Sequence, residues 1–520
     1  MPSPIQDPFK DWKFLVLPTL KVSDVFSLFL KATIAICTVV SISLVFYSFL
    51  NPSQRLPCPE CNKILISDHR KITNGEVSGY SYEKTNISHI LFGIGGSAKT
   101  WNKRRHYTEV WWMPNITRGY VWLDQKPPGN DTWPLTSPPY KVSADTSRFK
   151  YSSSYGSRSA LRIARIVKES FELGLENVRW LVMGDDDTVF FIENLVVVLA
   201  KYDHNQMFYI GGNSESVEQD EIHSYTMAYG GGGFAISYPL AKELVRVLDG
   251  CLDRYASFYG SDQKVQGCIS EIGVPLTKEL GFHQVDLRGD PYGLLAAHPL
   301  APLVSLHHLD YVQSIFPGLS RSDSVNKLIT AYKTDPGRTL QHSFCYDLTR
   351  NWSVSASWGY TIQLYPALLT AMQLQTVFRT FQTWRRWSEG PFTFNTRPMN
   401  VDPCIRPVVY FLDRIERVED GTLTTYKRSE DELDKVCDRP DYAPVYAVRS
   451  VNVITSTSLK PDIWNMVSSS SLNLLASLSA FFEKAPRRQC CEVINGENRM
   501  SSSVRVNIRG CNEMESVTPP

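Results

Sequence analysis

Several features that would point to other protein classes are missing from this chain of 520 residues. Basic residues do not cluster, and 54 Lys and Arg nearly balance 53 Asp and Glu, which leaves a net charge of +1. A nucleic-acid-binding protein concentrates positive charge, so we exclude that class. Charged residues make up 21% of the chain and hydrophobic residues 43%, which is typical of a globular protein and not of a disordered one.

Two common ligand-binding motifs are also incomplete. Cys58-Pro-Glu-Cys61 has the spacing of one half of a zinc knuckle, but no second pair of this kind follows. We therefore interpret these two cysteines as disulfide partners. The four glycines at 230–233 lack the spacing and the preceding strand of a dinucleotide-binding fingerprint.

One long uncharged segment sets the expected compartment. Residues 32–50 would form a helix of about 28 Å, close to the hydrocarbon thickness of a membrane. Lysines precede the segment and only Arg55 follows it closely, which predicts a cytosolic N-terminus. A cleaved signal peptide is the alternative, but the segment starts late, is too long and lacks a small-x-small site after Leu50. We predict a cytosolic tail at 1–31, a transmembrane signal-anchor at 32–50 and a lumenal remainder.

Two further features agree with a lumenal location. Sequons for N-glycosylation occur at Asn86, Asn115, Asn130 and Asn351. The chain has 11 cysteines. All but Cys37 follow the predicted anchor, and these ten cysteines are an even number that permits pairing into disulfides.

The pattern after the anchor predicts three regions. Residues 51–85 are polar with no sustained period, as expected for a stem. From residue 86 to about 325, strands alternate with helices, which predicts an α/β domain with a mostly parallel sheet and ligands at its carboxyl edge. The predicted strands are 89–94, 118–124 and 178–183, and the predicted helices begin near Ser157, Asn194 and Pro239.

Residues 326–520 have a different composition and predict a separate mixed or β-rich domain. The aromatic spacing of Phe378, Phe381, Trp384 and Trp387 predicts a buried helix face. Residues 407–412 and 422–427 predict a hairpin, and residues 503–508 alternate like a further strand.

Three consecutive carboxylates form the sharpest chemical feature. Asp185, Asp186 and Asp187 follow an apolar strand directly, and adjacent carboxylates repel one another unless a cation or several donors compensate. A turn that leads into a helix cap is the bland alternative, because Asp is common in both. At the mouth of a parallel sheet, a divalent metal that bridges these acids to a pyrophosphate is the stronger hypothesis.

Further candidate residues come later in the chain. The glycine-rich loop 230–233 lets the backbone approach a ligand closely, although a flexible loop is the alternative. Cys251 and Cys268 bracket Asp262, and a disulfide between them would hold that carboxylate in place. One histidine of the cluster could complete a carboxylate metal site; its members are His283, His298, His307 and His308.

Taken in order, these motifs resemble the fringe-like family of glycosyltransferases, which includes core-1 and many plant β-1,3-galactosyltransferases. A strand that ends in three aspartates is followed by a glycine-rich loop, by an acid before a Gly-Cys helix (Asp262 to Cys268) and by His308-Leu309-Asp310. The resemblance covers residues 86–325. The C-terminal extension is similar to fringe-related plant proteins that carry a domain of unknown function.

The resemblance implies specific roles for these residues. Asp187 and His308 would ligate Mn²⁺, with Mg²⁺ as the alternative metal and His283 as a rival ligand. Asp262 would be the catalytic base, although the family usually has two acids where this chain has Ser261-Asp262. The implied contacts to the nucleotide-sugar are Asp124, Asp185, Asp186, Gly231 and Gly232.

The implied fold is GT-A-like, and the implied activity is an inverting transfer from a UDP-sugar to a glycan or glycoprotein hydroxyl in the Golgi lumen. The transferred sugar would be a hexose or N-acetylhexosamine. Two other classes remain open: a catalytically silent lumenal glycan-binding protein with the same fold, and a metal-dependent phosphohydrolase, which also uses clustered aspartates at strand ends.

Overall fold

The computed structural model describes residues 33–43, 84–128, 132–419, 421–429, 437–456, 459, 486–494 and 502–518. The chain divides into two compact units, Met1–Tyr82 and Glu83–Pro520. In the first unit, residues 33–43 form a helix. Within the described residues, no helix combines the length and apolar character needed to cross a membrane. The predicted anchor also includes residues 32 and 44–50, and the predicted stem includes 51–83; these lie outside the described part.

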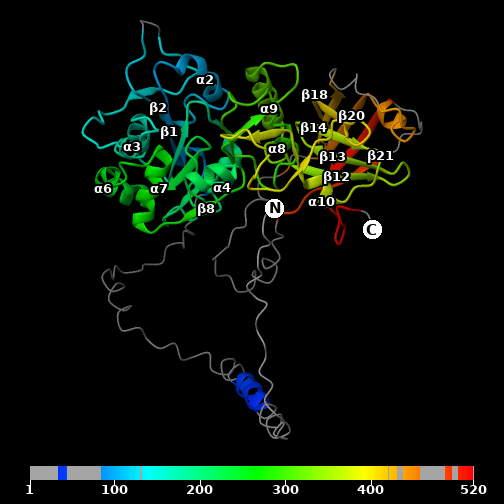
Figure 1. The fold of residues 1–520 in the computed structure, drawn as a ribbon, viewed down its shortest axis with the longest axis horizontal. Coiled ribbons are helices and arrows are strands. Elements are labelled where there is room, and N and C mark those ends of the chain that lie inside the picture. The colour runs from blue at the N-terminus through cyan, green and yellow to red at the C-terminus, as the bar shows by residue number, and fades with distance from the viewer. Residues whose placement is uncertain are drawn as a thin grey trace, which may run out of the picture. The chain divides into compact units, whose positions relative to one another are not determined.

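A seven-stranded sheet lies in the N-terminal part of the second unit, drawn in blue to green in Figure 1. Its strand order is β3-β2-β1-β4-β7-β6-β8. Only β7 runs antiparallel to its neighbours, so the prediction of a mostly parallel sheet is confirmed. The strands are β1 (Ile90–Gly95), β2 (Arg118–Leu123), β3 (Tyr140–Val142), β4 (Trp180–Asp185), β6 (Tyr209–Gly211), β7 (Phe234–Ser237) and β8 (Leu276–Lys278).

Amphipathic helices cover the sheet. Helices α3 (Ser159–Phe171), α6 (Tyr238–Arg254) and α7 (Ser261–Ile272) pack together over one face and share a core with Leu181 and Ile236. Ala160, Ala164 and Val167 lie on the buried side of α3, as their helical spacing predicts. Pro239 stands in the first turn of α6, where it needs no hydrogen-bond partner.

The second face of the sheet contributes to a core that continues into the C-terminal region. Helix α4 (Ile192–Leu199) begins two residues before its predicted start, and α2 (Trp101–Glu109) packs nearby. One hydrophobic cluster extends from Phe92 through Leu306 to Val506. Helix α9 (Arg321–Thr334) spans the predicted boundary near residue 325. The two-domain division therefore stays a prediction.

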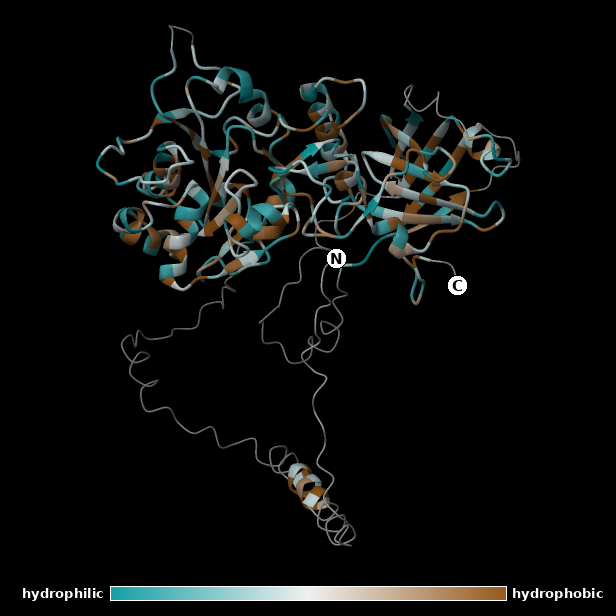
Figure 2. Ribbon diagram, in the orientation of Figure 1, coloured by the Kyte–Doolittle hydropathy of each residue, from teal (hydrophilic) through white to brown (hydrophobic). Residues whose placement is uncertain are grey.

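The C-terminal region contains a closed barrel in the order β12-β13-β14-β18-β19-β20-β22-β21. Its hairpin, β18 (Val408–Val418) with β19 (Gly421–Arg428), confirms the predicted turn. The predicted strand at 503–508 is β22 (Ser503–Arg509), where buried Val504, Val506 and Ile508 alternate with more exposed residues. Hydrophobic and hydrophilic stretches both occur along the strands of this region (Figure 2). The other barrel strands are β12 (His342–Asp347), β13 (Trp352–Ser357), β14 (Thr361–Tyr365), β20 (Ser450–Ser456) and β21 (Cys490–Ile494).

The predicted helix face at 378–387 is wrong. Phe378 lies in strand β15 (Val377–Arg379), Phe381 lies in β16 (Phe381–Thr383), and Trp384 to Trp387 form a turn. Strand pairing overrides the three-residue aromatic spacing, because β16 joins β10 (Leu287–Gly289) and β15 joins β17 (Thr396–Pro398).

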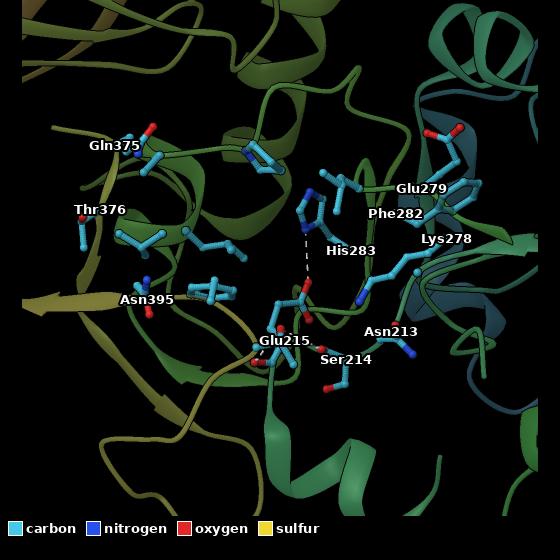
Figure 3. Close-up of a pocket in the computed structure, with 18 of the residues that line it drawn as sticks. Asn213, Ser214, Glu215, Lys278, Glu279, Phe282, His283, Gln375, Thr376 and Asn395 are labelled. Carbon is cyan, nitrogen blue, oxygen red and sulfur yellow. Dashed lines mark hydrogen bonds and ion pairs between the residues drawn. The ribbon is translucent and has the colours of Figure 1, made fainter. Parts of the chain in front are cut away.

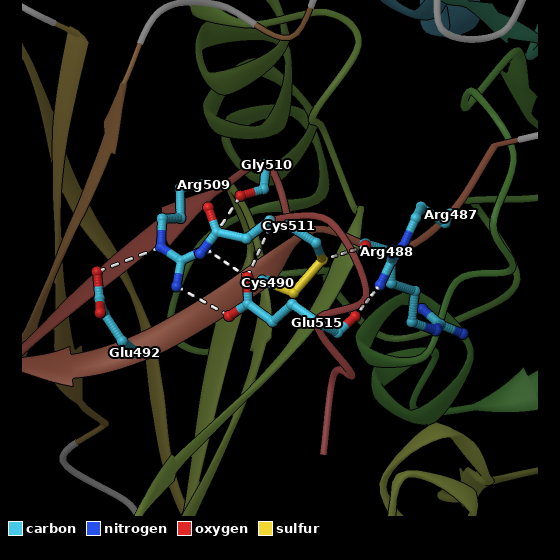
Figure 4. The surroundings of a disulfide bond; sticks show 9 residues. Arg487, Arg488, Cys490, Glu492, Arg509, Gly510, Cys511 and Glu515 are labelled. Carbon is cyan, nitrogen blue, oxygen red and sulfur yellow. Dashed lines mark hydrogen bonds and ion pairs between the residues drawn. A yellow bond between two sulfur atoms is a disulfide. The ribbon is translucent and has the colours of Figure 1, made fainter. Parts of the chain in front are cut away.

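Disulfides stabilise the second unit. The pair predicted around Asp262, Cys251–Cys268, is confirmed and links α6 to α7. The bonds Cys345–Cys491, Cys404–Cys437 and Cys490–Cys511 belong to the C-terminal region. Around Cys490–Cys511, Arg509 forms a bidentate ion pair with Glu515 at 2.8 and 2.9 Å (Figure 4). The pair Cys58 and Cys61 lies outside the described residues.

Candidate active site

The three aspartates stand at the carboxyl edge of the central sheet. Strand β4 ends at Asp185, and Asp186 and Asp187 turn away into the buried segment before β5 (Val189–Phe190). The backbone N–H of Asp185 donates to Oγ1 of Thr188 at 2.8 Å, which closes this acidic turn. A parallel sheet collects its strand ends at one edge, so the position is the one predicted.

The glycine-rich loop reaches the same edge because β7 is antiparallel to β4. Phe234, the first residue of β7, pairs with Met183 near the end of β4. Hydrogen bonds fix the loop at Gly231 and Gly232. Thr188 Oγ1 donates to the carbonyl of Gly231 at 2.7 Å, and the N–H of Gly232 donates to Gln284 Oε1 at 2.6 Å. The glycines therefore form a defined wall of the site.

His307 completes the acidic cluster. One ligating atom each from Asp185, Asp187 and His307 lies within 4.8 Å of the others, and His307 Nε2 is 3.0 Å from Asp187 Oδ1. Two carboxylate oxygens and one imidazole suit Mn²⁺ or Mg²⁺, with open positions for other oxygen ligands. The donor set thus fits the divalent metal that the sequence predicted.

His308, the histidine that the sequence comparison of motifs favoured, lies beside this cluster and faces another acid. Its Nδ1 is 3.0 Å from Asp286 Oδ1, and its ring stacks on that of His307 at 3.9 Å between centroids. The backbone of His308 has a φ of 53°, so the segment is not extended there and the two rings lie side by side; the hydrogen bond to Asp187 comes from His307 Nε2. The structure places His307 there.

The rival ligand His283 faces a separate cavity of about 360 Å³ (Figure 3). Its Nδ1 contacts Glu215 Oε1 at 3.2 Å, and its Nε2 contacts His298 Nε2 at 3.0 Å. Both ring nitrogens are therefore engaged away from the aspartates. His298 is buried, and burial lowers its pKa well below the usual value, so it is neutral.

The three aspartates differ in the direction in which their surroundings shift the pKa. Burial raises the pKa of Asp185 to about 7, although the nearby His307 opposes this rise. Burial would also raise the pKa of Asp187, but His307 and Arg104 outweigh it and hold that pKa well below its usual range. In return, Asp187 and Asp185 overcome the effect of burial on His307 and raise its pKa to about 8. The positive charge of protonated His307 therefore compensates part of the crowded negative charge.

Arg104 of α2 supplies further positive charge. Its Nη1 lies 3.2 Å from both Asp186 Oδ1 and Asp187 Oδ2, and its Nε lies 3.3 Å from Asp310 Oδ2. Burial and the neighbouring Asp187 raise the pKa of Asp186 to about 6 even with this partner. Asp186 is thereby held by protein groups, while Asp185 keeps a side chain that is 35% exposed and open to a ligand.

Asp124 stands one residue past β2, on the same edge of the sheet. It is exposed, and its Oδ1 accepts the N–H of Ala98 at 2.8 Å. Arg162 of α3 lies between Asp124 and Asp185 and donates to the carbonyls of Trp122 and Gly96, both at 2.9 Å. This arrangement leaves the Asp124 carboxylate able to accept a ribose or uracil donor.

Asp262 approaches the cluster from the first turn of α7. Its Oδ2 accepts the N–H of Gly230 at 3.2 Å, and its Oδ1 accepts the N–H of Gln263 at 2.9 Å. Asp262 and Asp185 line the same small recess beside Gly230. The disulfide Cys251–Cys268 anchors α7 one and a half turns later, as the sequence suggested.

Sequence reasoning missed Arg104 and Arg162 and did not choose His307. The arginines lie on amphipathic helices, where isolated cations are usually solvated, so they carried no local signal. His307 was within the histidine cluster, but only its contact with Asp187 distinguishes it from His308.

Gly231 is required by the close approach of His307. A Cβ at this position would overlap the imidazole ring. We expect Gly231→Ala to move His307 and reduce transfer by about 10²-fold, because displacements near 1 Å can have effects of that size. Gly250→Ala, on the exposed side of α6, is the matched control and should leave transfer unchanged. Equal activity of the two variants in a transfer assay would contradict this role of Gly231.

Comparisons with known proteins agree with this geometry. Residues 142–288 match the family described as fringe-like, and residues 219–472 match the family described as a protein of unknown function, DUF604. The first match contains Asp185, Gly231 and Asp262, and the second contains His307 and continues into the barrel.

Two curated relatives carry the name β-1,3-glucosyltransferase. The mouse protein is 30% identical over 149 residues, which cover 28% of this chain and 29% of the relative. The human protein is 32% identical over 152 residues, with the same coverage. The chain thus matches less than a third of the length of these relatives. Together, the family matches and relatives agree with the resemblance seen in the motifs: the chain contains a fringe-like region and is similar in part to β-1,3-glucosyltransferases.

Proposed function

We propose that this protein is a metal-dependent, inverting β-1,3-glycosyltransferase with a GT-A-like domain. It would transfer a hexose or N-acetylhexosamine from a UDP-sugar to a hydroxyl of a glycan or glycoprotein. The observation that carries the proposal is the convergence of Asp185, Asp187 and His307 within 4.8 Å, next to Asp262 and the glycine-rich loop. Because the relatives are β-1,3-glucosyltransferases, UDP-glucose is the first donor to test.

The residues of the site have distinct roles in the proposed reaction. Asp185, Asp187 and His307 would hold Mn²⁺ or Mg²⁺, which would supply positive charge for the departing diphosphate. Asp124 and the backbone at Gly231 and Gly232 would position the nucleotide-sugar, while Asp186, which is buried and paired with Arg104, would support the site from behind.

Asp262 would accept the proton of the acceptor hydroxyl while that oxygen attacks the anomeric carbon. Its two bonds to backbone N–H groups fix the orientation of the carboxylate. A single displacement at the anomeric carbon inverts its configuration.

The decisive experiment measures UDP release by the purified full chain. We expect release from UDP-glucose or a related donor to depend on Mn²⁺ and on an acceptor glycan. Binding of UDP and glycans without turnover would favour the silent binding protein, and Mn²⁺-dependent hydrolysis of phosphate esters would favour the phosphohydrolase. No described contact supports the phosphohydrolase specifically.

We further propose that the protein acts in the Golgi lumen and is held there by residues 32–50 as a single-pass type II anchor. The uncharged segment, the preceding lysines and the disulfides support this topology. Asn115 and Asn351, two of the predicted acceptor residues, are exposed. Protease treatment of sealed vesicles should leave all but the N-terminal tail intact, and digestion of the large C-terminal part would refute the proposal.

A further inference from the structure

A four-residue turn from the C-terminal region lies beside the histidines of the site. Strand β16 pairs with β10, and the N–H of Thr383 donates to the carbonyl of Ser388 at 2.8 Å, which closes the turn Trp384–Trp387. Glu218 of α5 (Val217–Ile222) is buried and accepts the N–H groups of Arg385 and Arg386. A buried carboxylate therefore holds the turn in one position.

Stacked rings connect this turn to the acidic cluster. The ring of Trp384 stacks on His308 with 4.3 Å between centroids and an interplanar angle of 3°. His308 in turn stacks on His307, which contacts Asp187. One aromatic ring, that of His308, thus lies between Trp384 of the turn and the candidate metal ligand His307.

Arg288 lies among three aromatic rings of this part of the molecule. Its guanidinium is 3.8 Å from the ring centroid of Trp384, 5.3 Å from that of Trp387 and 5.0 Å from that of Tyr311. Its Nε donates to the carbonyl of Trp384 at 3.2 Å. Among the described residues, no acceptor lies within hydrogen-bond distance of its two terminal nitrogens, so these four N–H groups are available to a ligand.

Two of the aromatic side chains face solvent. Trp387 is 58% exposed and Tyr311 is 42% exposed. The backbone of Trp387 also has a φ of 54°, in the left-handed region that bulky residues rarely occupy. Burial would not favour this conformation, since most of the ring remains in water. A held, exposed aromatic ring next to free guanidinium donors is a surface suited to a ligand with an apolar face and hydroxyl groups.

We propose that Trp387, Tyr311 and Arg288 form a binding platform for a saccharide unit of the acceptor. The apolar face of a sugar ring packs on Trp387, and its hydroxyl oxygens accept hydrogen bonds from Arg288. That the saccharide is the acceptor of a sugar transfer rests on the proposed function. The platform joins the cluster through His308, whereas Asp124 and Arg162 approach Asp185 from β2 and α3.

The platform is tested with a glycan array and the full chain in the presence of UDP and Mn²⁺. Trp387→Ala should weaken binding to the glycans that the wild type recognises by about tenfold or more, the effect of losing one aromatic contact surface. Trp387→Phe should recover most of the binding. Arg288→Lys should weaken binding too, because lysine keeps the charge but loses the planar donor fork.

The control variant is Tyr238→Ala, which removes an exposed aromatic side chain at the start of α6, at the opposite edge of the sheet. It should bind the same glycans as the wild type. Calorimetry of UDP with Mn²⁺ should give the same affinity for every variant.

The inference would be overturned if Trp387→Ala bound glycans as the wild type does, or if the wild type bound no glycan. The proposed function is tested separately, by the binding of UDP with Mn²⁺. Loss of glycan binding in a protein that never binds UDP would support a saccharide site and refute the transferase.

Discussion

Replacing Asp187 with asparagine should weaken Mn²⁺-dependent binding of UDP by more than about 100-fold and abolish measurable transfer. Even residues that only support metal ligands account for about 10–100-fold in affinity, so the loss of a ligand should exceed that range. Asp187 is also the acid with the lowest pKa of the three, which makes it the carboxylate most able to bind a cation without first losing a proton. Calorimetric titration of UDP in the presence and absence of Mn²⁺ measures the effect.

Asp310→Asn is the matched control for charge. Asp310 also pairs with Arg104, at 3.3 Å, but does not belong to the cluster that can hold a metal. It should keep Mn²⁺-dependent UDP binding, and both variants should unfold within a few degrees of the wild type. If Asp187→Asn binds Mn²⁺ and UDP as the wild type does, the acidic cluster is not a metal site and is only a turn.

The same titration separates the two histidines. His307→Gln should lose metal-dependent binding nearly as fully as Asp187→Asn, because its imidazole is the one that reaches Asp187. His308→Gln should retain more of it, since that side chain pairs with Asp286. The reverse order would restore the assignment that the sequence motifs favoured.

Replacing Asp262 with asparagine should reduce transfer by about 10²–10⁴-fold, the usual contribution of a general base. Asparagine is nearly isosteric and keeps one oxygen to accept the N–H of Gln263 or Gly230. It cannot take a proton from the acceptor hydroxyl. Binding of UDP with Mn²⁺ should therefore persist while the rate of the chemical step falls, which single-turnover measurements would resolve.

Asp253→Asn provides the comparison for this experiment. Asp253 lies on α6 and accepts the N–H of Lys150 at 3.1 Å, so the substitution places the same amide next to a backbone N–H group away from the acidic cluster. Its transfer rate should equal that of the wild type. If Asp262→Asn changes transfer by less than about threefold, Asp262 only caps α7, and the base lies elsewhere or the protein is not a catalyst.

Much of the sheet could be predicted because its strands are buried on both faces. The apolar run 180–183 has few alternatives once a carboxylate cluster ends it, and the helical spacing of α3 is equally clear. The aromatic repeat at 378–387 failed because period alone cannot choose between a short helix and paired strands. Its partner strand β10 is nearly a hundred residues away in sequence, and only the folded chain brings them together.

The sequence by itself determined that three carboxylates end a buried strand, that glycines enter the next strand and that a cysteine pair brackets Asp262. These are local patterns, and they were enough to indicate a fringe-like site. Only the tertiary structure shows that His307 contacts Asp187 and that Trp384 stacks on His308. It also shows that Arg104 pairs with Asp187 and that Arg162 lies near the acids. These contacts join residues some 20 to 120 positions apart, and the direction of a side chain across such a gap depends on how the separate elements pack, which no local period encodes.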